Sequence, residues 1–341
     1  MTDRETIAAM PKTEVHLHLE GTISPDTLWA MAARNGIALP VNSLDELKAL
    51  YTFENFDKFI KVWLMMCSCL KSEDDYVGMV DGFVAECRRQ NIRYSEVHFS
   101  PYNHEKFGIG AHRAFKVVTR RLQEAEASAG PVTRLITDIP SEAAPESGDF
   151  TAAFLEANAN PLIVAMGLGG PEAGFPRAPF APYFKRARMA GYPCVAHAGE
   201  TAGAEHVRQA VLDLGAQRIQ HGIRAVEDEA VLKLLAERRI CCDVALSSNA
   251  CLTAYTDIAK HPIRRMVDAG LPVTLSTDDP PFFGTDLIRE YRLANEEAGL
   301  SLAELWQINL NGLRYGLADV GLRRRLLLEF EAAGKALGIP A

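Results

Sequence analysis

Two histidines separated by one residue, His16 and His18, lie near the start of the chain. The segment around them, residues 14–20 (EVHLHLE), alternates polar and apolar residues. This alternation is typical of a β-strand and directs both imidazoles to the same face, where they are able to bind one metal ion. Most isolated His-x-His pairs bind no metal, so this interpretation requires further ligands elsewhere in the chain.

Further metal-ligating and acidic residues occur in three later segments. They are His197 and Glu200 in HAGE, His221 in HG, and Asp278 and Asp279 in TDDP. Imidazole and carboxylate together suit zinc better than iron or manganese. The expected ligands of one Zn²⁺ per chain are His16, His18, His197 and Asp278. Such a site leaves a position open for water, whose pKa the ion lowers from about 15.7 towards 7. The alternative is a set of ordinary strand-end histidines with an aspartate pair capping a helix.

Two residues beside the expected ligands are candidates for acid–base chemistry. Glu200 follows His197 by three residues, near enough to act as an acid without being a ligand. His221 is either a further ligand or the group that positions and deprotonates the water. No serine lies in a G-x-S-x-G segment, which disfavours hydrolysis by a serine nucleophile.

Eight short apolar segments are candidates for strands. They are residues 14–19, 93–99, 132–138, 162–168, 193–197, 217–221, 240–246 and 272–278. Helical patterns separate most of them, at residues 113–127, 178–190, 204–214, 227–238 and 261–269. Repeated βα units imply parallel strands, so the sequence predicts an α/β fold, a (β/α)8 TIM-type barrel, with a doubly wound open sheet as the alternative. In a barrel, residues at the carboxyl ends of the strands meet at one mouth, where the candidate residues fall.

Extra helices are expected outside the barrel repeat. The patterns lie at residues 53–70 and 72–90, after the first strand, and at 302–314 and 318–337, at the end of the chain. No change of composition divides the sequence, so we expect one domain over residues 1–341. Residues 140–147 are expected to be a loop. Residues 167–174 match no phosphate-binding motif, and Pro171 would interrupt the helix start that such a motif needs. They are expected to form a flexible loop over the site.

Composition limits the possible partners. The net charge is −8 and the longest basic run is residues 323–325, which argues against nucleic acid and membrane surfaces as partners. The first residues lack the apolar core of a signal peptide, and the seven cysteines contain no Cys-x-x-Cys. We therefore expect small buried thiols in a reducing cytoplasm. Monomer and homo-oligomer are not distinguished. His98 is expected in the barrel interior or in a structural role. Loop or helix-surface positions are expected for His104, His112, His206 and His261.

The motifs, taken together, resemble the adenosine deaminase family of metal-dependent amidohydrolases. Matching segments occur in the family's order at residues 11–21, 94–101, 197–200, 218–222, 247–249 and 277–280. The resemblance implies a (β/α)8 barrel with one zinc on the four ligands already named. It implies that Glu200 protonates the purine N1, that His221 orients the attacking hydroxide, that Asp279 bonds N7, and that the Gly170 backbone meets N3. The expected substrate-binding residues are His18, Glu20, Gly170 and Asp279.

The expected reaction is hydrolytic deamination of a 6-aminopurine, with adenosine as the expected substrate. Adenine and modified adenine nucleosides remain alternatives, because Glu20 stands where nucleoside-specific members more often have aspartate. Gly167 also departs from the family pattern, which has an aspartate there. The competing hypotheses are another zinc hydrolase, acting on an amide, ester or phosphate, and a non-catalytic purine-binding or metal-binding barrel. No lysine in residues 162–168 is available to bridge two metals, which favours a single ion.

Overall fold

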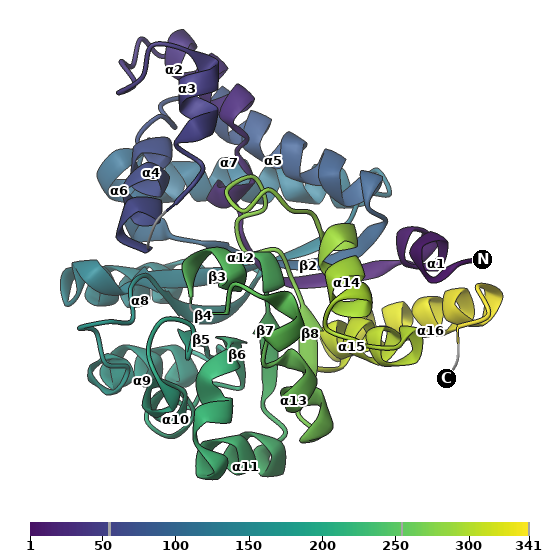
Figure 1. Ribbon diagram of the computed structural model, residues 1–341. Helices are drawn as coiled ribbons and strands as arrows, with labels where there is room; N and C mark the ends of the chain where they lie inside the picture. The colour runs from purple at the N-terminus through teal and green to yellow at the C-terminus, as the bar shows by residue number, and fades with distance from the viewer. Residues whose placement is uncertain (54–55, 254, 340–341) are drawn as a thin grey trace.

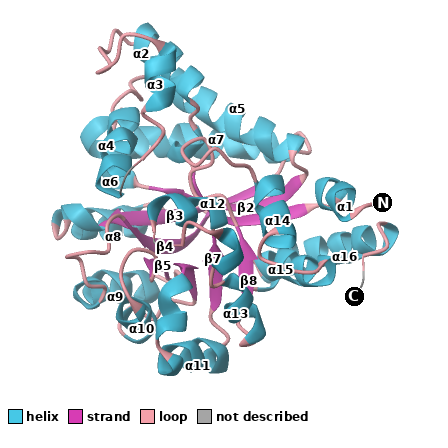
Figure 2. Cartoon of the chain, in the orientation of Figure 1, coloured by secondary structure: helices cyan, strands magenta, loops and turns pink. Residues whose placement is uncertain are grey.

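Eight parallel strands form the centre of the protein in the computed structural model, which describes residues 1–53, 56–253 and 255–339. The strands are β1 (Lys12–His18), β2 (Ile92–Phe99), β3 (Val132–Pro140), β4 (Ile163–Gly169), β5 (Val195–Ala198), β6 (Arg218–His221), β7 (Cys241–Val244) and β8 (Val273–Leu275). Helices surround them, as Figures 1 and 2 show. Nearly all the strand residues are buried, as expected when helices cover a parallel sheet.

Two seams close the sheet into a barrel. The strands pair in two parallel runs, β1 to β4 and β5 to β8. Met166 bridges to Cys194 between β4 and β5, and Leu17 bridges to Asp278 between β1 and the end of β8. At this second seam the His18 amide donates to the Asp278 carbonyl over 2.9 Å. The predicted (β/α)8 barrel is therefore confirmed, and the open sheet is wrong.

The helices occupy the intervals between the strands and both ends of the chain. Before β2 these are α1 (Asp3–Ala9), α2 (Pro25–Arg34), α3 (Leu44–Ala49), α4 (Phe56–Cys67) and α5 (Glu73–Arg89). Between β2 and β5 they are α6 (Pro101–Phe107), α7 (Ala111–Ala127), α8 (Glu146–Ala157) and α9 (Ala181–Met189). The rest are α10 (Ala204–Leu212), α11 (Glu229–Arg238), α12 (Leu246–Leu252), α13 (Ile263–Asp268), α14 (Leu287–Glu296), α15 (Leu302–Arg314) and α16 (Val320–Ala336).

The segment between β1 and β2 supplies the extra helices predicted there. Ser24 caps α2 by accepting the Thr27 amide, and Pro25 occupies the first helical position, the combination expected at a helix start. Aromatic residues of α4 pack on the loop after β8, for example Phe59 against Phe283. This contact holds α4 over the mouth of the barrel.

Several predicted boundaries need correction. The seventh and eighth strands are shorter than the apolar runs, because Leu246 begins α12 and the chain bends after Leu275. Gly169, predicted in a flexible loop, is part of β4. Residues 140–147 are not a plain loop, since a short 3-10 helix and the start of α8 lie within them. In each case contacts with neighbouring elements decide where the strand or helix ends, and the local sequence alone does not predict that residue.

A buried ion network supports the barrel beneath its mouth. Arg218 on β6 donates to Glu96 on β2 and to Asp243 on β7, both over 2.6 Å. All three side chains are fully buried, so each charge has a direct partner in the low-dielectric interior. Within the described residues, no helix is both long enough and apolar enough to span a membrane.

Candidate metal centre and active site

The strand ends bring the predicted residues to one mouth of the barrel. His16 and His18 lie on β1, His197 on β5 and His221 at the end of β6, and Asp278 follows β8. His221 and Asp278 adopt left-handed backbone conformations, with φ of 62° and 66°. Non-glycine residues rarely adopt this conformation, and such strain concentrates at functional sites.

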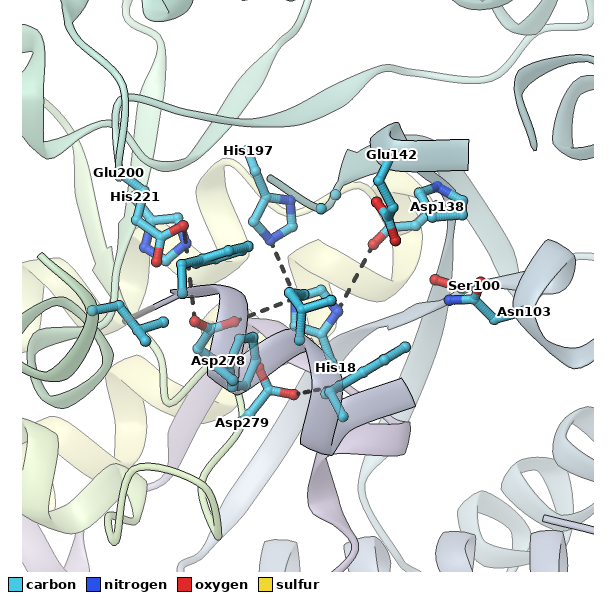
Figure 3. A pocket seen from close by; sticks show the side chains of 18 residues that line it. His18, Ser100, Asn103, Asp138, Glu142, His197, Glu200, His221, Asp278 and Asp279 are labelled. Atoms are coloured by element: carbon cyan, nitrogen blue, oxygen red, sulfur yellow. Dashed lines mark hydrogen bonds and ion pairs between the residues drawn. The ribbon is translucent and has the colours of Figure 1, made fainter. Parts of the chain in front are cut away.

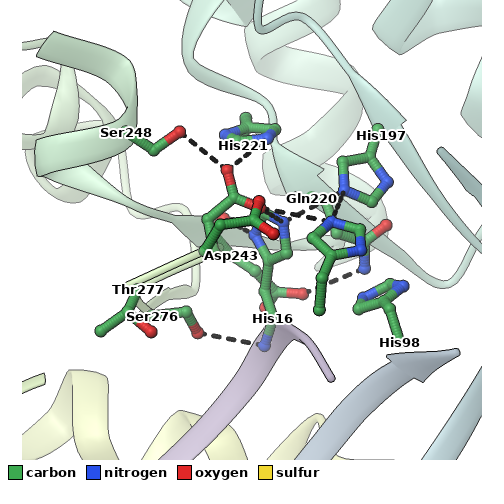
Figure 4. A network of polar contacts seen from close by, with 12 residues as sticks. His16, His98, His197, Gln220, His221, Asp243, Ser248, Ser276 and Thr277 are labelled. Carbon is green, nitrogen blue, oxygen red and sulfur yellow. Dashed lines mark hydrogen bonds and ion pairs between the residues drawn. The ribbon is translucent and has the colours of Figure 1, made fainter. Parts of the chain in front are cut away.

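Three imidazoles and one carboxylate converge on a common point. The Nε2 atoms of His16 and His18 are each 3.2 Å from Nε2 of His197. Each also lies 3.3 Å from Oδ1 of Asp278. Ligands about 2.0–2.1 Å from a tetrahedral zinc lie about 3.3 Å from one another. These four separations match those between the ligands of one Zn²⁺ ion (Figures 3 and 4). The ligand atoms that all lie within 4.8 Å of one another are those of His16, His197, His221 and Asp278, and His18 forms a second such group with Asp278 and Asp279.

The outer nitrogens of the same imidazoles have acceptors that fix the rings. Nδ1 of His16 donates to the Asp243 carbonyl over 3.0 Å, and Nδ1 of His197 donates to the Leu168 carbonyl over 2.8 Å. Nδ1 of His18 faces a carboxylate oxygen of Asp138 at 3.9 Å. The two carbonyl acceptors direct the Nε2 lone pairs of His16 and His197 inward, which is the usual arrangement around metal-bound histidine.

The charge around His18 also suits a cation. Burial alone would lower the pKa of His18, but the carboxylates of Asp279, Asp278 and Asp138 outweigh it and raise that pKa to about 10. These carboxylates stabilise a positive charge at the position of the ligand cluster. A divalent metal supplies that charge, so the electrostatics and the donor set agree.

His221 borders the same cluster from the side of β6. Its ligand atom lies within 4.8 Å of those of His16, His197 and Asp278, so geometry alone permits it as a ligand. Its Nε2 faces Oδ2 of Asp278 at 3.9 Å and Oε2 of Glu200 at 3.6 Å. His221 therefore stands between the ligand cluster and the acid, as Figure 3 shows.

Glu200 is a buried carboxyl group at one end of the pocket. Its Oε1 atom has no hydrogen-bond partner, and its backbone amide donates to Glu172 over 3.3 Å. Burial raises the pKa of Glu200 well above its usual value, and the nearby Asp278 carboxylate adds to the rise. The group is therefore suited to hold a proton and donate it.

Asp279 faces the same pocket from below the ligand cluster. The Trp63 indole donates to Oδ1 of Asp279 over 3.1 Å, which links α4 to the active site. A Cβ at Gly21 would lie only 1.7 Å from that same oxygen. Glycine is therefore required at residue 21 if Asp279 is to keep this position.

One pocket at this mouth of the barrel brings these residues together. Its walls include Gly170, as the sequence predicted. Figure 3 shows Glu200 and His221 at one end and Ser100, Asn103 and Glu142 at the other. Apolar residues of α4 form another wall, namely Phe56, Phe59, Ile60 and Trp63.

Glu20 is not placed where the sequence prediction expected it. Its side chain is fully buried and is absent from the pocket lining. Oε1 accepts the Ser100 amide over 3.1 Å and bonds Nε2 of His104 over 2.7 Å. The structure thus gives Glu20 a position behind the pocket wall, because the 3-10 turn after β1 directs it towards α6.

Two histidines expected at the surface are also buried. His104 is 1% exposed and His261 is 4% exposed. His104 bonds Glu20 and the Tyr76 hydroxyl, and His261 bonds Asn249. His104 lies on the buried side of α6, so its helix-surface prediction is wrong, whereas His261 lies in a loop as predicted but is buried there by its contacts.

Sequence reasoning also missed Asp138, which lines the pocket from β3. Its carboxylate bonds Nδ1 of His98 over 2.9 Å, which places His98 in the barrel interior. A Cβ at Gly167 would lie 1.8 Å from Oδ1 of Asp138. Asp138 thus occupies the space of a side chain at residue 167, the position where the family pattern has aspartate. In the sequence, the absence of the family's aspartate at residue 167 was the sign that another residue fills this space.

Comparison with known proteins agrees with this geometry. The sequence model of the family described as adenosine deaminase matches residues 11–333. The chain is 37% identical over 327 residues to an aminodeoxyfutalosine deaminase from Streptomyces coelicolor, covering 95% of this chain and 84% of that protein. The solved structure of an adenine deaminase from Arthrobacter aurescens has a TM-score of 0.91 at 30% identity, covering 96% of this chain and 100% of that one.

A solved amidohydrolase from Burkholderia ambifaria with bound zinc has a TM-score of 0.89 at 26% identity, covering 100% of this chain and 96% of that one. The family match extends over nearly the whole chain, and the ligand cluster fits the same metal. The protein therefore belongs to the adenosine deaminase family and is a hydrolase that deaminates adenine-type substrates.

Proposed function

We propose that the protein hydrolyses the C6 amino group of a modified adenine nucleoside such as aminodeoxyfutalosine. The observation that carries the reaction type is the buried acid Glu200 beside His221, facing three imidazoles and a carboxylate across one pocket. Hydrolytic removal of an amine from an aromatic ring requires an acid, an imidazole that orients the water, and a metal site.

We infer that one zinc ion is held by His16, His18, His197 and Asp278. This assignment is supported by the convergence of their ligand atoms and by the acceptors on the outer histidine nitrogens. The ion would supply a water of lowered pKa at neutral pH. His221 is assigned outside the ligand set, since its Nε2 also faces Glu200.

The remaining residues act on the purine. Glu200 donates its proton to N1, which makes C6 electrophilic, and Asp279 and the Gly170 backbone hold the ring at N7 and N3. Water adds its oxygen to C6, the C6–N bond breaks and ammonia leaves. One water proton completes the ammonia and the other returns to Glu200, so the acid is restored for the next turnover.

The lining of the pocket supports a substituent at N9. From the reactive end at Glu200 and His221 the pocket continues to Ser100, Asn103 and Glu142. These polar groups suit sugar hydroxyls, and the apolar wall of α4 suits a larger apolar extension. The relative from Streptomyces coelicolor, an aminodeoxyfutalosine deaminase, points to the same substrate class.

Adenine is the second candidate. It is favoured by the position of Glu20, which is buried behind the pocket wall with Oε1 bonded to His104 and does not line the pocket that a ribose would enter. The structural relative named adenine deaminase supports it as well. The position of Glu20 and the adenine deaminase relative both support adenine more than adenosine, the substrate expected from sequence.

Ammonia release from zinc-loaded protein tests these proposals with aminodeoxyfutalosine, adenosine, 2′-deoxyadenosine, adenine and AMP. We expect the modified nucleoside to have the highest kcat/KM. AMP should be the poorest, because Asp138, Glu142 and Asp279 line the pocket and no lysine or arginine does among its described lining residues. Chelated protein is the control. Fastest turnover of adenine would select the second candidate, and no turnover of any compound would overturn the proposal.

We also propose that the enzyme works in the reducing cytoplasm. All seven cysteines are free, including the adjacent pair Cys241 and Cys242. Free thiols in this number are typical of proteins that remain in a reducing compartment.

A further inference from the structure

His221 ends a hydrogen-bonded chain of three side chains that reaches away from the active site. Nδ1 of His221 lies 3.0 Å from Nδ2 of Asn249 on α12, and Oδ1 of Asn249 lies 3.2 Å from Nε2 of His261. The three residues are between 0% and 4% exposed. Neither Asn249 nor His261 lines the pocket, so their contacts concern His221 and not the substrate.

A backbone amide fixes the direction of this chain. The Ile263 amide donates to Nδ1 of His261 over 3.1 Å, and an amide N–H only donates. Nδ1 of His261 therefore carries a lone pair. Burial lowers the pKa of His261 to about 3, so the ring is neutral at pH 7. Its single proton must then lie on Nε2, which donates to Asn249.

The donor and acceptor roles fixed at His261 also fix those of Asn249 and His221. Because the Asn249 oxygen accepts from His261, its amide nitrogen faces His221 and donates to Nδ1. A protonated Nδ1 on His221 would set two donors against each other at 3.0 Å. His221 is therefore neutral with its proton on Nε2, the atom that faces Glu200 and Asp278.

We propose that Asn249 and His261 are positioning residues that fix the tautomer of His221, so that its Nε2 donates a hydrogen bond to the attacking oxygen and does not remove a proton from it. This inference rests on the deaminase function proposed above. Asp278, and Glu200 once it has given its proton to N1, face the same point and are then the groups available to accept the water's proton. Of the two roles considered for His221 from sequence, positioning is retained and deprotonation is excluded.

The isosteric change Asn249→Asp tests this inference, because aspartate accepts at both oxygens. His261 keeps its acceptor, but His221 must now carry a proton on Nδ1 to bond residue 249, so its neutral ring has no proton on Nε2. We expect kcat to fall about 10²–10³-fold, as when one donor to a developing oxyanion is removed. Zinc content and KM should stay unchanged, because residue 249 contacts neither metal nor substrate.

The matched variant Asn249→Ala separates positioning from structural support. Alanine removes both hydrogen bonds and packing but leaves the tautomer of His221 free, so its kcat should fall less than that of Asn249→Asp. A purely structural role predicts the opposite order, with alanine the more damaging change. Wild-type kcat in Asn249→Asp, or alanine the worse of the two, would overturn the inference.

A direct measurement on the unmodified enzyme completes the test. NMR of isotope-labelled histidine rings in the zinc-loaded protein distinguishes the two neutral tautomers, with His221→Gln used to assign the signal. We expect the His221 proton on Nε2, and a proton on Nδ1 would overturn the inference even if Asn249→Asp fails to fold. This readout uses no substrate, so it is independent of whether the proposed deaminase activity is found.

Discussion

Glu200 shows how a single residue acquires its chemistry from its surroundings. Its carboxyl is buried, one oxygen has no partner, and the Asp278 carboxylate lies nearby. All three features disfavour the ionised form. The same residue at the surface would be ionised at neutral pH and would have no proton to give.

Glu200→Gln is expected to lower kcat about 10²–10⁴-fold, the usual contribution of a general acid. Glutamine preserves the shape of the side chain but carries no acidic proton, so zinc content should not change. Steady-state kinetics and metal analysis measure the two effects. Glu142→Gln, on the opposite wall of the pocket, is the matched control and should change KM more than kcat. Undiminished turnover in Glu200→Gln would remove Glu200 from the mechanism.

Glu14 on β1 provides a pH prediction. It accepts the amide and hydroxyl of Thr277 over 3.0 and 2.6 Å, and burial raises its pKa from 4.5 to about 7. Between these values the folded protein holds a proton that the unfolded chain has lost. Stability from this group is therefore complete below pH 4.5 and is lost as the pH rises through 7.

Glu14→Gln should not show this loss, because glutamine accepts the same hydrogen bonds without ionising. Relative to wild type, its free energy of unfolding should rise by about 2–3 kcal/mol between pH 4.5 and 8, at about 1.4 kcal/mol for each pKa unit. Denaturant unfolding of both proteins at the two pH values measures this difference. If the two proteins differ in free energy of unfolding by the same amount at both pH values, the pKa of Glu14 is not raised in the folded protein.

At the residue scale the sequence predicted groups at strand ends better than groups that depend on distant partners. His16, His18, His197 and Asp278 were expected together because the ends of parallel strands converge at one mouth. Glu20 was expected in the pocket and lies behind its wall, because a short turn redirects the side chain. Asn249 was noted only as part of the matching segment 247–249, because its proposed role in positioning His221 depends on its contact with His261.

Elements set the geometry of the ligand cluster through their pairing. The amide of Asp278 donates to the His16 carbonyl over 3.2 Å, across the seam between β8 and β1. Two of the proposed zinc ligands are therefore joined by backbone hydrogen bonds across this seam. Such a support keeps ligands near their working geometry before a metal binds.

The β3–β4 pair yields a prediction about the exchange of two residues. Asp138 pairs with Gly167 in register, bonds Nδ1 of His98 over 2.9 Å and faces Nδ1 of His18 at 3.9 Å. Gly167→Asp should place two carboxylates in one space, and Asp138→Ala should remove the acceptor of His98 and the carboxylate that faces His18. Each single change is expected to weaken zinc affinity about 10–100-fold, as loss of an outer partner usually does.

The double variant Asp138→Ala/Gly167→Asp should recover part of that affinity, because it returns a carboxylate to the same space from the neighbouring strand. Zinc titration against a competing chelator measures all four proteins. Asp257→Ala, a change at an exposed cap, serves as the control. If the double variant loses the sum of the two single losses, the two positions do not share this role.

At the element scale the prediction was strongest where periodicity was regular. All eight strands and the long helices α5, α7, α15 and α16 appear close to the predicted residues. The short helices α3, α6 and α12 were missed, because segments of this length carry too little periodicity to be recognised. Their positions are set by contacts with the barrel, which a single sequence does not show.

For the whole molecule, zinc should act as a stabilising ligand. A ligand that binds only the folded state adds about 4 kcal/mol at a concentration a thousand times its Kd. The Tm of the loaded protein should therefore exceed that of the chelated protein by several degrees, measured by differential scanning calorimetry. His197→Ala should abolish the difference. A zinc-dependent rise that persists in this variant would place the metal elsewhere.

The seam between β8 and β1 also bears on how the protein is made. His16 and His18 leave the ribosome early, whereas Asp278 follows only after most of the chain has been synthesised. Asn309 on α15, which holds β1 through the Thr13 amide and the Pro11 carbonyl, emerges later still. At roughly 5–20 residues per second, the two halves of the ligand set are separated by tens of seconds. With the proposed ligand set, metal loading is expected only after the last strand of the barrel has been made, and until then the histidine pair lacks its carboxylate partner.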